Sequence, residues 1–294
     1  MDIDKKIVVF GEVLFDRFPN GQTVIGGAPF NVAWNLKSFG AEPLFVSGIG
    51  DDEMGEKVLQ HMNERDMCLD GIQTHNVHPT GRVEVSFSGN EPSYDIMNNC
   101  AYDFIDTSEL PEIHSNSYVY HGTLALRNGL SENSLQNIVK NSPSSVFTDV
   151  NLRKPWYDTA KVIELLKKAR WIKLSEDELN VLVPGDNILT DKLNYLFDFL
   201  KPELITITLG KRGVIGLTAN MELFEIPAKP VDKVVDSVGA GDAFSSVLLL
   251  GLIKNWNIAV SIERAQDFAR SVIGIRGAIT TEKSFYETTI KQWN

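Results

Sequence analysis

The sequence predicts an α/β fold in which a mostly parallel β-sheet is flanked by helices. Short apolar runs that are typical of buried strands alternate with amphipathic segments of helical periodicity. The predicted strands span residues 7–10, 44–49, 145–150, 171–174 and 204–209. The predicted helices span residues 31–39, 54–65, 159–170 and 186–200. One further segment, residues 82–88, breaks this alternation with a period of two.

The predicted strands consist mainly of apolar residues, as expected for strands covered by helices on both faces. The helix expected over residues 159–170 has one apolar face and carries lysines opposite to it. That face is formed by Val162, Ile163, Leu165, Leu166 and Ala169.

Residues 82–88 have the pattern of a half-exposed antiparallel strand, with Val83, Val85 and Phe87 on one face. With residues 15–25 they are expected to form a small sheet that projects from the main body. The alternative is an edge hairpin of the main sheet. A projecting sheet has no core beneath its apolar face, so that face would cover a bound ligand or a second subunit.

Composition excludes several classes of protein. The chain has 294 residues, 43% hydrophobic and 23% charged, as in ordinary globular proteins. Its net charge of −11 argues against nucleic acid or an anionic membrane as the main partner. Cys68 and Cys100 have no metal-ligand spacing and are expected to be free thiols. We find no signal-peptide pattern, and the longest apolar stretch is too short to span a bilayer, so we expect a cytoplasmic protein.

The turn from Gly239 to Asp242 is the first candidate for chemistry. Its Gly-Ala-Gly sequence leads into an apolar, helix-compatible run, so backbone amides at a helix start can converge on an anion. Asp242 adds a carboxylate beside those amides. An anion cradle with a base at its rim is what phosphoryl transfer to a hydroxyl requires. The alternative is an ordinary acidic residue in the first turn of a helix.

Other phosphate-binding patterns are missing from the sequence. There is no Gly-x-x-x-x-Gly-Lys-Ser/Thr motif, no complete dinucleotide fingerprint and no protein-kinase motif set. Any anion site is therefore expected at Gly239–Asp242.

A second motif, Gly-Gly-Ala-Pro-Phe-Asn-Val-Ala at residues 26–33, precedes that turn by some 200 residues. Together the two resemble the PfkB, or ribokinase-like, family of carbohydrate kinases, and the Gly-Gly-Ala-Pro form is similar to its fructokinase branch. The resemblance extends along nearly the whole chain. It includes residues 11–16, 121–127, 149–153, 208–210 and 277–278.

The resemblance implies one ribokinase-like domain over residues 1–294, a three-layer αβα sandwich whose small β-sheet lid uses strands from about 15–25 and 82–105. It implies transfer of the γ-phosphate of ATP to a hydroxyl of a free sugar, with fructose as the first substrate. Ribose, 2-keto-3-deoxygluconate or a nucleoside are alternative acceptors. A catalytically silent sugar- or nucleotide-binding regulator is an alternative from another class. The lid also allows a homodimer.

The resemblance also implies roles for individual residues. Asp242 would be the general base, with Gly239, Ala240 and Gly241 holding the phosphoryl group. The sugar would be bound by Asp16, Gly27, Asn31 and Arg153. ATP would be bound by Asn151, Thr208, Gly210, Lys211 and Gly213, together with Gly239 and Gly241. Glu178 would bind Mg²⁺ through water, and Asp236 would bind a monovalent cation such as K⁺.

Each assignment has a plainer alternative. Asp16 could be a solvated loop carboxylate, Asn31 a helix-capping amide, and Glu178 an acidic residue at a helix start. The 208–213 turn could be purely structural. Two departures from the family pattern stand out: Ser175 replaces an Asn, and Val247 takes the place of a small residue.

Overall fold

The computed structural model describes residues 7–88, 91–141, 145–231 and 233–293. Within these residues nine strands form one sheet, in the order β13-β12-β11-β10-β9-β8-β1-β4-β5. Neighbours from β11 to β5 are parallel, and β12 and β13 are antiparallel additions at one edge. The strands are β1 (Ile7–Phe10), β4 (Pro43–Gly50), β5 (Ile72–His75), β8 (Tyr118–His121), β9 (Val146–Asp149), β10 (Trp171–Ser175), β11 (Leu204–Thr208), β12 (Val214–Thr218) and β13 (Leu223–Ile226).

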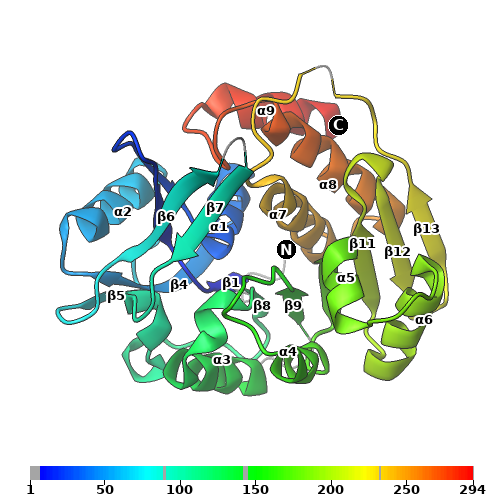
Figure 1. The fold of residues 1–294 in the computed structure, drawn as a ribbon, viewed down its shortest axis with the longest axis horizontal. Helices are drawn as coiled ribbons and strands as arrows, with labels where there is room; N and C mark the ends of the chain where they lie inside the picture. The colour runs from blue at the N-terminus through cyan, green and yellow to red at the C-terminus, as the bar shows by residue number, and fades with distance from the viewer. Residues whose placement is uncertain (1–6, 89–90, 142–144, 232, 294) are drawn as a thin grey trace.

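Helices cover both faces of this sheet, which gives three layers (Figure 1). One face packs against α1 (Ala28–Ser38), α2 (Glu53–Glu64), α7 (Ala240–Ile253), α8 (Ile258–Ile273) and α9 (Lys283–Trp293). The other face packs against α3 (Gly129–Asn141), α4 (Thr159–Leu166), α5 (Glu176–Leu182) and α6 (Leu189–Leu200). Consecutive strand residues alternate between the two cores: Ile7 and Val9 belong to one, Val8 and Phe10 to the other.

Helix α7 is buried almost all round, because it lies between α1, α8 and the sheet. Every residue from Ala243 to Leu252 is buried, which explains why this segment has no polar face. Val247 is fully buried, so the core accommodates its side chain where the family pattern has a small residue. This packing fixes the first turn of α7.

Four strands form a second, separate sheet, so the edge-hairpin alternative is wrong. They are β2 (Leu14–Arg17), β3 (Thr23–Gly26), β6 (Gly81–Ser88) and β7 (Glu91–Ile96), in the order β3-β2-β6-β7. Figure 1 shows β6 and β7 beside α1 and the start of α7. Val83 and Val85 are buried and face a cleft; the side chain of Phe87 lies outside the described part.

The expected extent of the lid to residue 105 is wrong. The strand ends at Ile96, and residues Ala101–Phe104 form a 3₁₀ helix, η1. The carboxylate of Asp103 accepts a hydrogen bond from the Cys100 amide at 3.0 Å and pairs with the Arg127 guanidinium at 2.7 Å. These side-chain contacts hold the segment in a tight turn, and Cys100 and Tyr102 pack against Leu14, Val83 and Ile96 of the small sheet without adding a strand to it.

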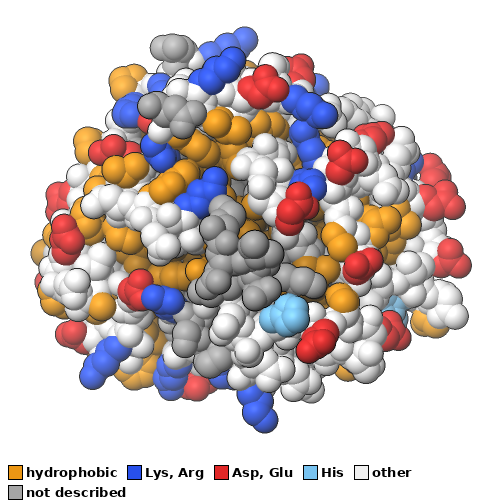
Figure 2. Space-filling view, turned by 180° about the vertical axis from the view of Figure 1, so that it is seen from behind, with side chains coloured by type: hydrophobic (Ala, Val, Ile, Leu, Met, Phe, Trp, Pro, Cys, Tyr) orange, Lys and Arg blue, Asp and Glu red, His pale blue; other side chains and the backbone are white. Residues whose placement is uncertain are grey.

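The outer surface carries charges of both signs. Figure 2 shows acidic and basic side chains interspersed on the face opposite to that of Figure 1. Among the described residues, no helix is long and apolar enough to cross a membrane. Cys68 is exposed and Cys100 is buried, and both are free thiols, as expected.

Candidate active site

A cleft of about 1040 Å³ lies at the carboxyl ends of the parallel strands, between the small sheet and the start of α7. This is the edge at which open α/β sheets bind ligands. The cleft brings together most of the predicted site residues. They are Asp16, Gly27, Asn31, Asn151, Arg153, Asp236, Gly239, Gly241 and Asp242.

The first turn of α7 has the geometry of an anion site. Gly239 caps the helix in the left-handed conformation, with φ 79°, and a Cβ atom there would lie 2.3 Å from the Cβ of Ala278. A Cβ atom on Gly241 would lie 3.1 Å from the Lys173 ammonium. Amides of the first turn have no preceding helical carbonyl to bind, and here a buried ammonium lies beside them. The donor set fits the phosphate groups of a nucleotide.

Asn31 positions the candidate base. Its Nδ2 donates a hydrogen bond to Oδ2 of Asp242 at 2.7 Å, while its Oδ1 is buried and has no partner in the described part of the chain. Helix α1 begins at Gly27 without a side-chain cap, so the capping alternative for Asn31 is wrong. Asn31 is therefore oriented toward Asp242, and its Oδ1 can still accept a hydrogen bond.

Lys173 is held by a buried network beneath the turn. Its Nζ donates to both oxygens of Asp149, at 2.9 and 3.2 Å. Oδ2 of Asp149 also accepts from Ser245 Oγ at 2.6 Å and from the Tyr120 hydroxyl at 3.2 Å. Burial raises the pKa of Asp149, although Lys173 opposes that shift. Burial alone would lower the pKa of Lys173, but the carboxylates of Asp149 and Glu178 raise it. Lys173 is therefore a fixed cation.

Two carboxylates face the side of the cleft that the small sheet covers. Burial raises the pKa of Asp16 to about 6; Arg153 lowers it and Asp236 raises it. Burial raises the pKa of Glu12 to about 7, with Arg153 lowering it and Asp242 raising it. The positive charge of Arg153 therefore lowers the pKa of both carboxylates. The solvated-loop alternative for Asp16 is not supported, because desolvation dominates its environment.

Asp236 connects two loops at the rim of the cleft. Its Oδ1 accepts from the Val238 amide at 3.0 Å and its Oδ2 accepts from the Gly277 amide at 3.1 Å. Val238 directly precedes the anion turn, and Gly277 directly precedes Ala278, which packs against Gly239. Asp236 therefore holds together the two segments that enclose Gly239.

Glu178 closes a capping box at the start of α5. Its Oε2 accepts from the amide and the hydroxyl of Ser175 at 2.7 and 2.9 Å, and its Oε1 accepts from the Leu152 amide at 2.8 Å. Ser175 thus replaces the expected Asn with a hydroxyl donor. Among the described residues, no group of three His, Cys, Asp or Glu side chains fits a metal ion. The donor set fits Mg²⁺ only as an ion held mainly by phosphates and water.

The remaining predicted nucleotide residues lie outside the lining of the cleft. Thr208 ends β11, and Gly210, Lys211 and Gly213 belong to the turn that follows it, which contains the 3₁₀ helix η4 (Gly210–Arg212). Ala240 is in the first turn of α7 but does not line the cleft either. Lys211 is exposed, and the guanidinium of Arg212 pairs with Glu176 of α5. Because β11 is parallel to β10, this turn lies at the same edge of the sheet as the cleft.

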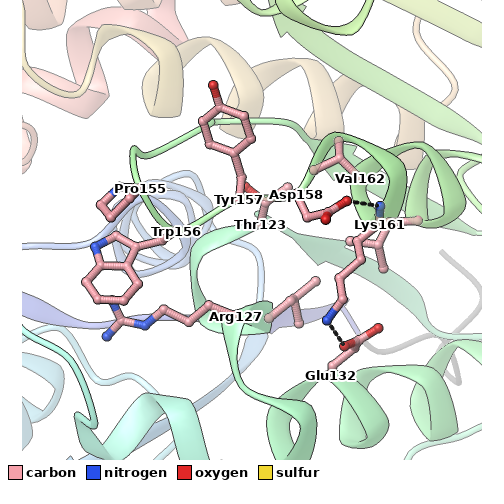
Figure 3. Close-up of a pocket in the computed structure, with 11 residues that line it drawn as sticks. Thr123, Arg127, Glu132, Pro155, Trp156, Tyr157, Asp158, Lys161 and Val162 are labelled. Atoms are coloured by element: carbon pink, nitrogen blue, oxygen red, sulfur yellow. Dashed lines mark hydrogen bonds and ion pairs between the residues drawn. The ribbon is translucent and has the colours of Figure 1, made fainter.

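A second, smaller pocket of about 350 Å³ lies where the loop after β9 meets the 3₁₀ helix η3 (Leu124–Arg127) and α4. Figure 3 shows Trp156 and Tyr157 of the loop on one side and Lys161 on the other, with its ammonium directed at Glu132. The guanidinium carbon of Arg127 lies 4.5 Å from the ring centroid of Trp156. This stacking holds the loop that carries Arg153.

Sequence reasoning did not assign a role to Lys173. It used Glu12 only within the resemblance, where Gly11-Glu12 favours fructose and the carboxylate disfavours a phosphorylated sugar. Lys173 had a usable signal, because a lysine in the middle of an apolar strand is rarely buried without a charged partner. Glu12 follows a buried strand directly, at the edge where ligands bind. The contact between Asn31 and Asp242 has no local signal at all.

The fold and cleft define a class: a three-layer α/β phosphotransferase with an anion turn, a carboxylate beside it and a small sheet over the acceptor side. A model of the pfkB family of carbohydrate kinases matches residues 4–284, and the chain belongs to this family. It is an ATP-dependent sugar kinase.

Individual relatives agree with this family. The chain is 29% identical to a fructokinase of Klebsiella pneumoniae over 263 residues, 84% of each chain. An aminoimidazole riboside kinase from Salmonella enterica, crystallised with aminoimidazole riboside and an ATP analogue, superposes with a TM-score of 0.84 at 26% identity, covering 97% of this chain and 100% of that one. A Vibrio cholerae fructokinase superposes with a TM-score of 0.85 at 24% identity, covering 97% and 99%, and shows the shared fold.

Proposed function

We propose that the protein transfers the γ-phosphate of ATP to a hydroxyl of a free sugar, with D-fructose as its first substrate. The observation that carries this proposal is the hydrogen bond from Asn31 to Asp242 beside the first turn of α7. It joins a sugar-side residue to the carboxylate at the anion turn. A base fixed in this way can reach a hydroxyl that approaches the phosphate-binding amides.

In the reaction, Asp242 takes the proton of the attacking hydroxyl as the oxygen forms its bond to the γ-phosphorus. The bond from that phosphorus to the β,γ-bridging oxygen breaks, and ADP leaves. The amides of Gly239–Asp242 and the Lys173 ammonium stabilise the negative charge of the phosphoryl group in transit.

The rest of the nucleotide lies along the carboxyl edge of the sheet. Asn151 in the cleft and the turn at residues 208–213 flank that path. Mg²⁺ would neutralise the phosphate charge, and Glu178 would hold its water ligands. Asp236 would hold a monovalent cation behind the turn.

Charge in the cleft supports a neutral acceptor. Asp16 and Glu12 line the sugar side, and both would repel a phosphorylated sugar or a sugar acid. Arg153 can donate hydrogen bonds to hydroxyl groups of a sugar that lies near Asp16 and Glu12. The Klebsiella relative, a fructokinase, supports fructose among the neutral sugars.

A nucleoside is the second candidate acceptor. The superposition with the aminoimidazole riboside kinase favours it, because the cleft of about 1040 Å³ has room for a base beside the sugar. The catalytic assignments are the same for either acceptor.

Mixing the protein with Mg-ATP and a panel of acceptors, and following ADP release, tests the proposal. The panel contains fructose, ribose, 2-keto-3-deoxygluconate and aminoimidazole riboside. We expect fructose to give the highest kcat/KM. A higher value for the riboside would replace fructose with a nucleoside, and no acceptor-dependent ADP release at all would contradict the proposed function.

A further inference from the structure

Glu12 is a buried carboxylate that lines the cleft, and the proposal above uses only its charge, which disfavours anionic acceptors. It follows β1 directly, and only 2% of it is exposed. A Cβ atom on Gly27 would lie 2.5 Å from the Glu12 carbonyl oxygen, so the start of α1 packs directly against the Glu12 backbone. The position of Glu12 is therefore set by the central sheet and α1.

The carboxylate of Glu12 is not satisfied by the protein. Its Oε2 is buried and accepts no hydrogen bond among the described residues. An unpaired buried carboxylate oxygen is costly, and proteins rarely keep one without a use. The charged and titratable groups that act on Glu12 are Arg153, Arg127, Asp242, Tyr102 and Tyr120.

Arg127 does not supply the missing bond. Its Nη1 is also buried and finds no partner among the residues that the structure describes. Its other nitrogens bind Asp103, Tyr102 and the Met97 carbonyl. Because Glu12 lines the cleft, a molecule bound there can supply the missing donor.

We propose that Glu12 determines acceptor specificity, because its free Oε2 accepts a hydrogen bond from one hydroxyl group of the bound sugar. This inference rests on the proposed function, since it needs a sugar in the cleft. A site built around one hydroxyl discriminates strongly against an analogue that lacks it, because the buried acceptor is then left unpaired. Glu12 would thus select a sugar that carries a hydroxyl at one particular position.

The protonation of Glu12 supports this role. Burial raises the pKa of Glu12 to about 7 in the ligand-free cleft. A hydroxyl that donates to the carboxylate favours its ionised form, so sugar binding lowers this pKa again. Binding near pH 7 then releases a proton from Glu12.

The first test compares kcat/KM for the best sugar of the panel and for each of its monodeoxy analogues. It uses the wild type, Glu12→Gln, and Asp16→Asn as a matched control at a second carboxylate of the cleft. For one analogue, we expect the fall in kcat/KM relative to the parent sugar to be at least about tenfold larger in the wild type than in Glu12→Gln. A difference of this size reflects the loss of a hydrogen bond to a charged acceptor. Asp16→Asn should remain sensitive to that same hydroxyl.

A second test can be read from the wild type alone, and the two variants assign the proton to one carboxylate. Calorimetric titration of the same sugar at pH 7, in two buffers of different ionisation enthalpy, counts protons released on binding. Asp16→Asn should still release protons, and Glu12→Gln should not. The inference would be overturned if every analogue lost the same factor in kcat/KM in the wild type and in Glu12→Gln, or if the wild type released no proton on binding the sugar. Either result would leave the kinase activity intact. A wild type that phosphorylates no sugar removes both the proposed function and this inference.

Discussion

Asn31 and Asp242 lie 211 positions apart in the sequence and are joined by a hydrogen bond of 2.7 Å. The donor comes from α1, and the acceptor from the first turn of α7. The orientation of the candidate base therefore depends on the packing of two helices. In the function proposed above, this contact would couple acceptor binding to proton transfer.

Replacing Asp242 by Asn should lower kcat by about 10²–10⁴-fold, because the amide cannot take the proton of the hydroxyl. Sugar binding, measured by calorimetry, should change little, because the amide keeps the shape and can still accept from Asn31. Near-normal turnover would reassign Asp242 to a helix-start role.

The two glycines of the anion turn should respond differently to alanine. Gly239→Ala forces a Cβ into the left-handed conformation and against Ala278, so the strain of about 1–2 kcal/mol or more should lower Tm by several degrees. Gly241→Ala places a Cβ atom 3.1 Å from the Lys173 ammonium, which has to move by only a few tenths of an ångström, so Tm should fall less than in Gly239→Ala while kcat falls. Equal effects on Tm, measured by calorimetry, would contradict the assignment of Lys173 to the turn.

Lys173→Met should be strongly destabilising, by about 3–5 kcal/mol, because it leaves the buried Asp149 carboxylate unpaired. Adding Asp149→Asn removes that charge and should recover much of the stability. If Lys173 stabilises the phosphoryl group, kcat of the double variant should stay low. Denaturant unfolding and kcat separate the two effects, and recovery of both would make the role of Lys173 purely structural.

Asp16→Ala should raise the KM for the sugar about ten- to a hundredfold and leave the KM for ATP unchanged, because a charged hydrogen-bond partner is lost. The pKa of Asp16 is raised to about 6, so the wild-type KM for the sugar should also rise as pH falls through 6. Asp16→Asn should lack this pH dependence. Equal changes in both KM values would show that the sugar site is misplaced.

The stability of the ligand-free protein should report the burial of Glu12. Its pKa is raised from 4.5 to about 7, so the folded state retains a proton that the unfolded state loses. The protein therefore loses stability as pH rises from about 4.5 to 7, by about 3 kcal/mol from this group. The difference in unfolding free energy between wild type and Glu12→Gln should change by that amount between pH 4.5 and 8. A constant difference would show that Glu12 is not desolvated.

Local pattern was sufficient for the strands at the centre of the sheet. Strand β1 matches its expected range, β4 is longer by one residue at each end, and β10 is longer by one residue at its end. These strands could be predicted because helices cover both faces and an apolar run is required. Strand β8 was not predicted. Its tyrosines and His121 read as polar in sequence, although the Tyr120 hydroxyl is satisfied by Asp149, 29 positions away.

The site was predictable only where a motif carries the chemistry. The anion turn and Asp16 could be found because their residues lie within short, ordered patterns. The charge beside the turn comes from Lys173 on a strand remote in sequence, and its partner Asp149 lies on the neighbouring strand. Such pairs follow from sheet order, which residue spacing does not encode.

The burial of α7 has a consequence for the order in which the enzyme is made. Helix α7 completes the core, and it is synthesised after the residues that precede Gly239. Until then, the surfaces of α1 and of the sheet that pack against α7 remain uncovered. The side chain of Trp34 likewise waits for the Thr280 carbonyl, to which its Nε1 donates at 3.1 Å. Because contacts so distant in sequence form late, a nascent chain can hold most of the acceptor side before it can catalyse. Catalytic competence thus requires synthesis of the residues from Gly239 onward.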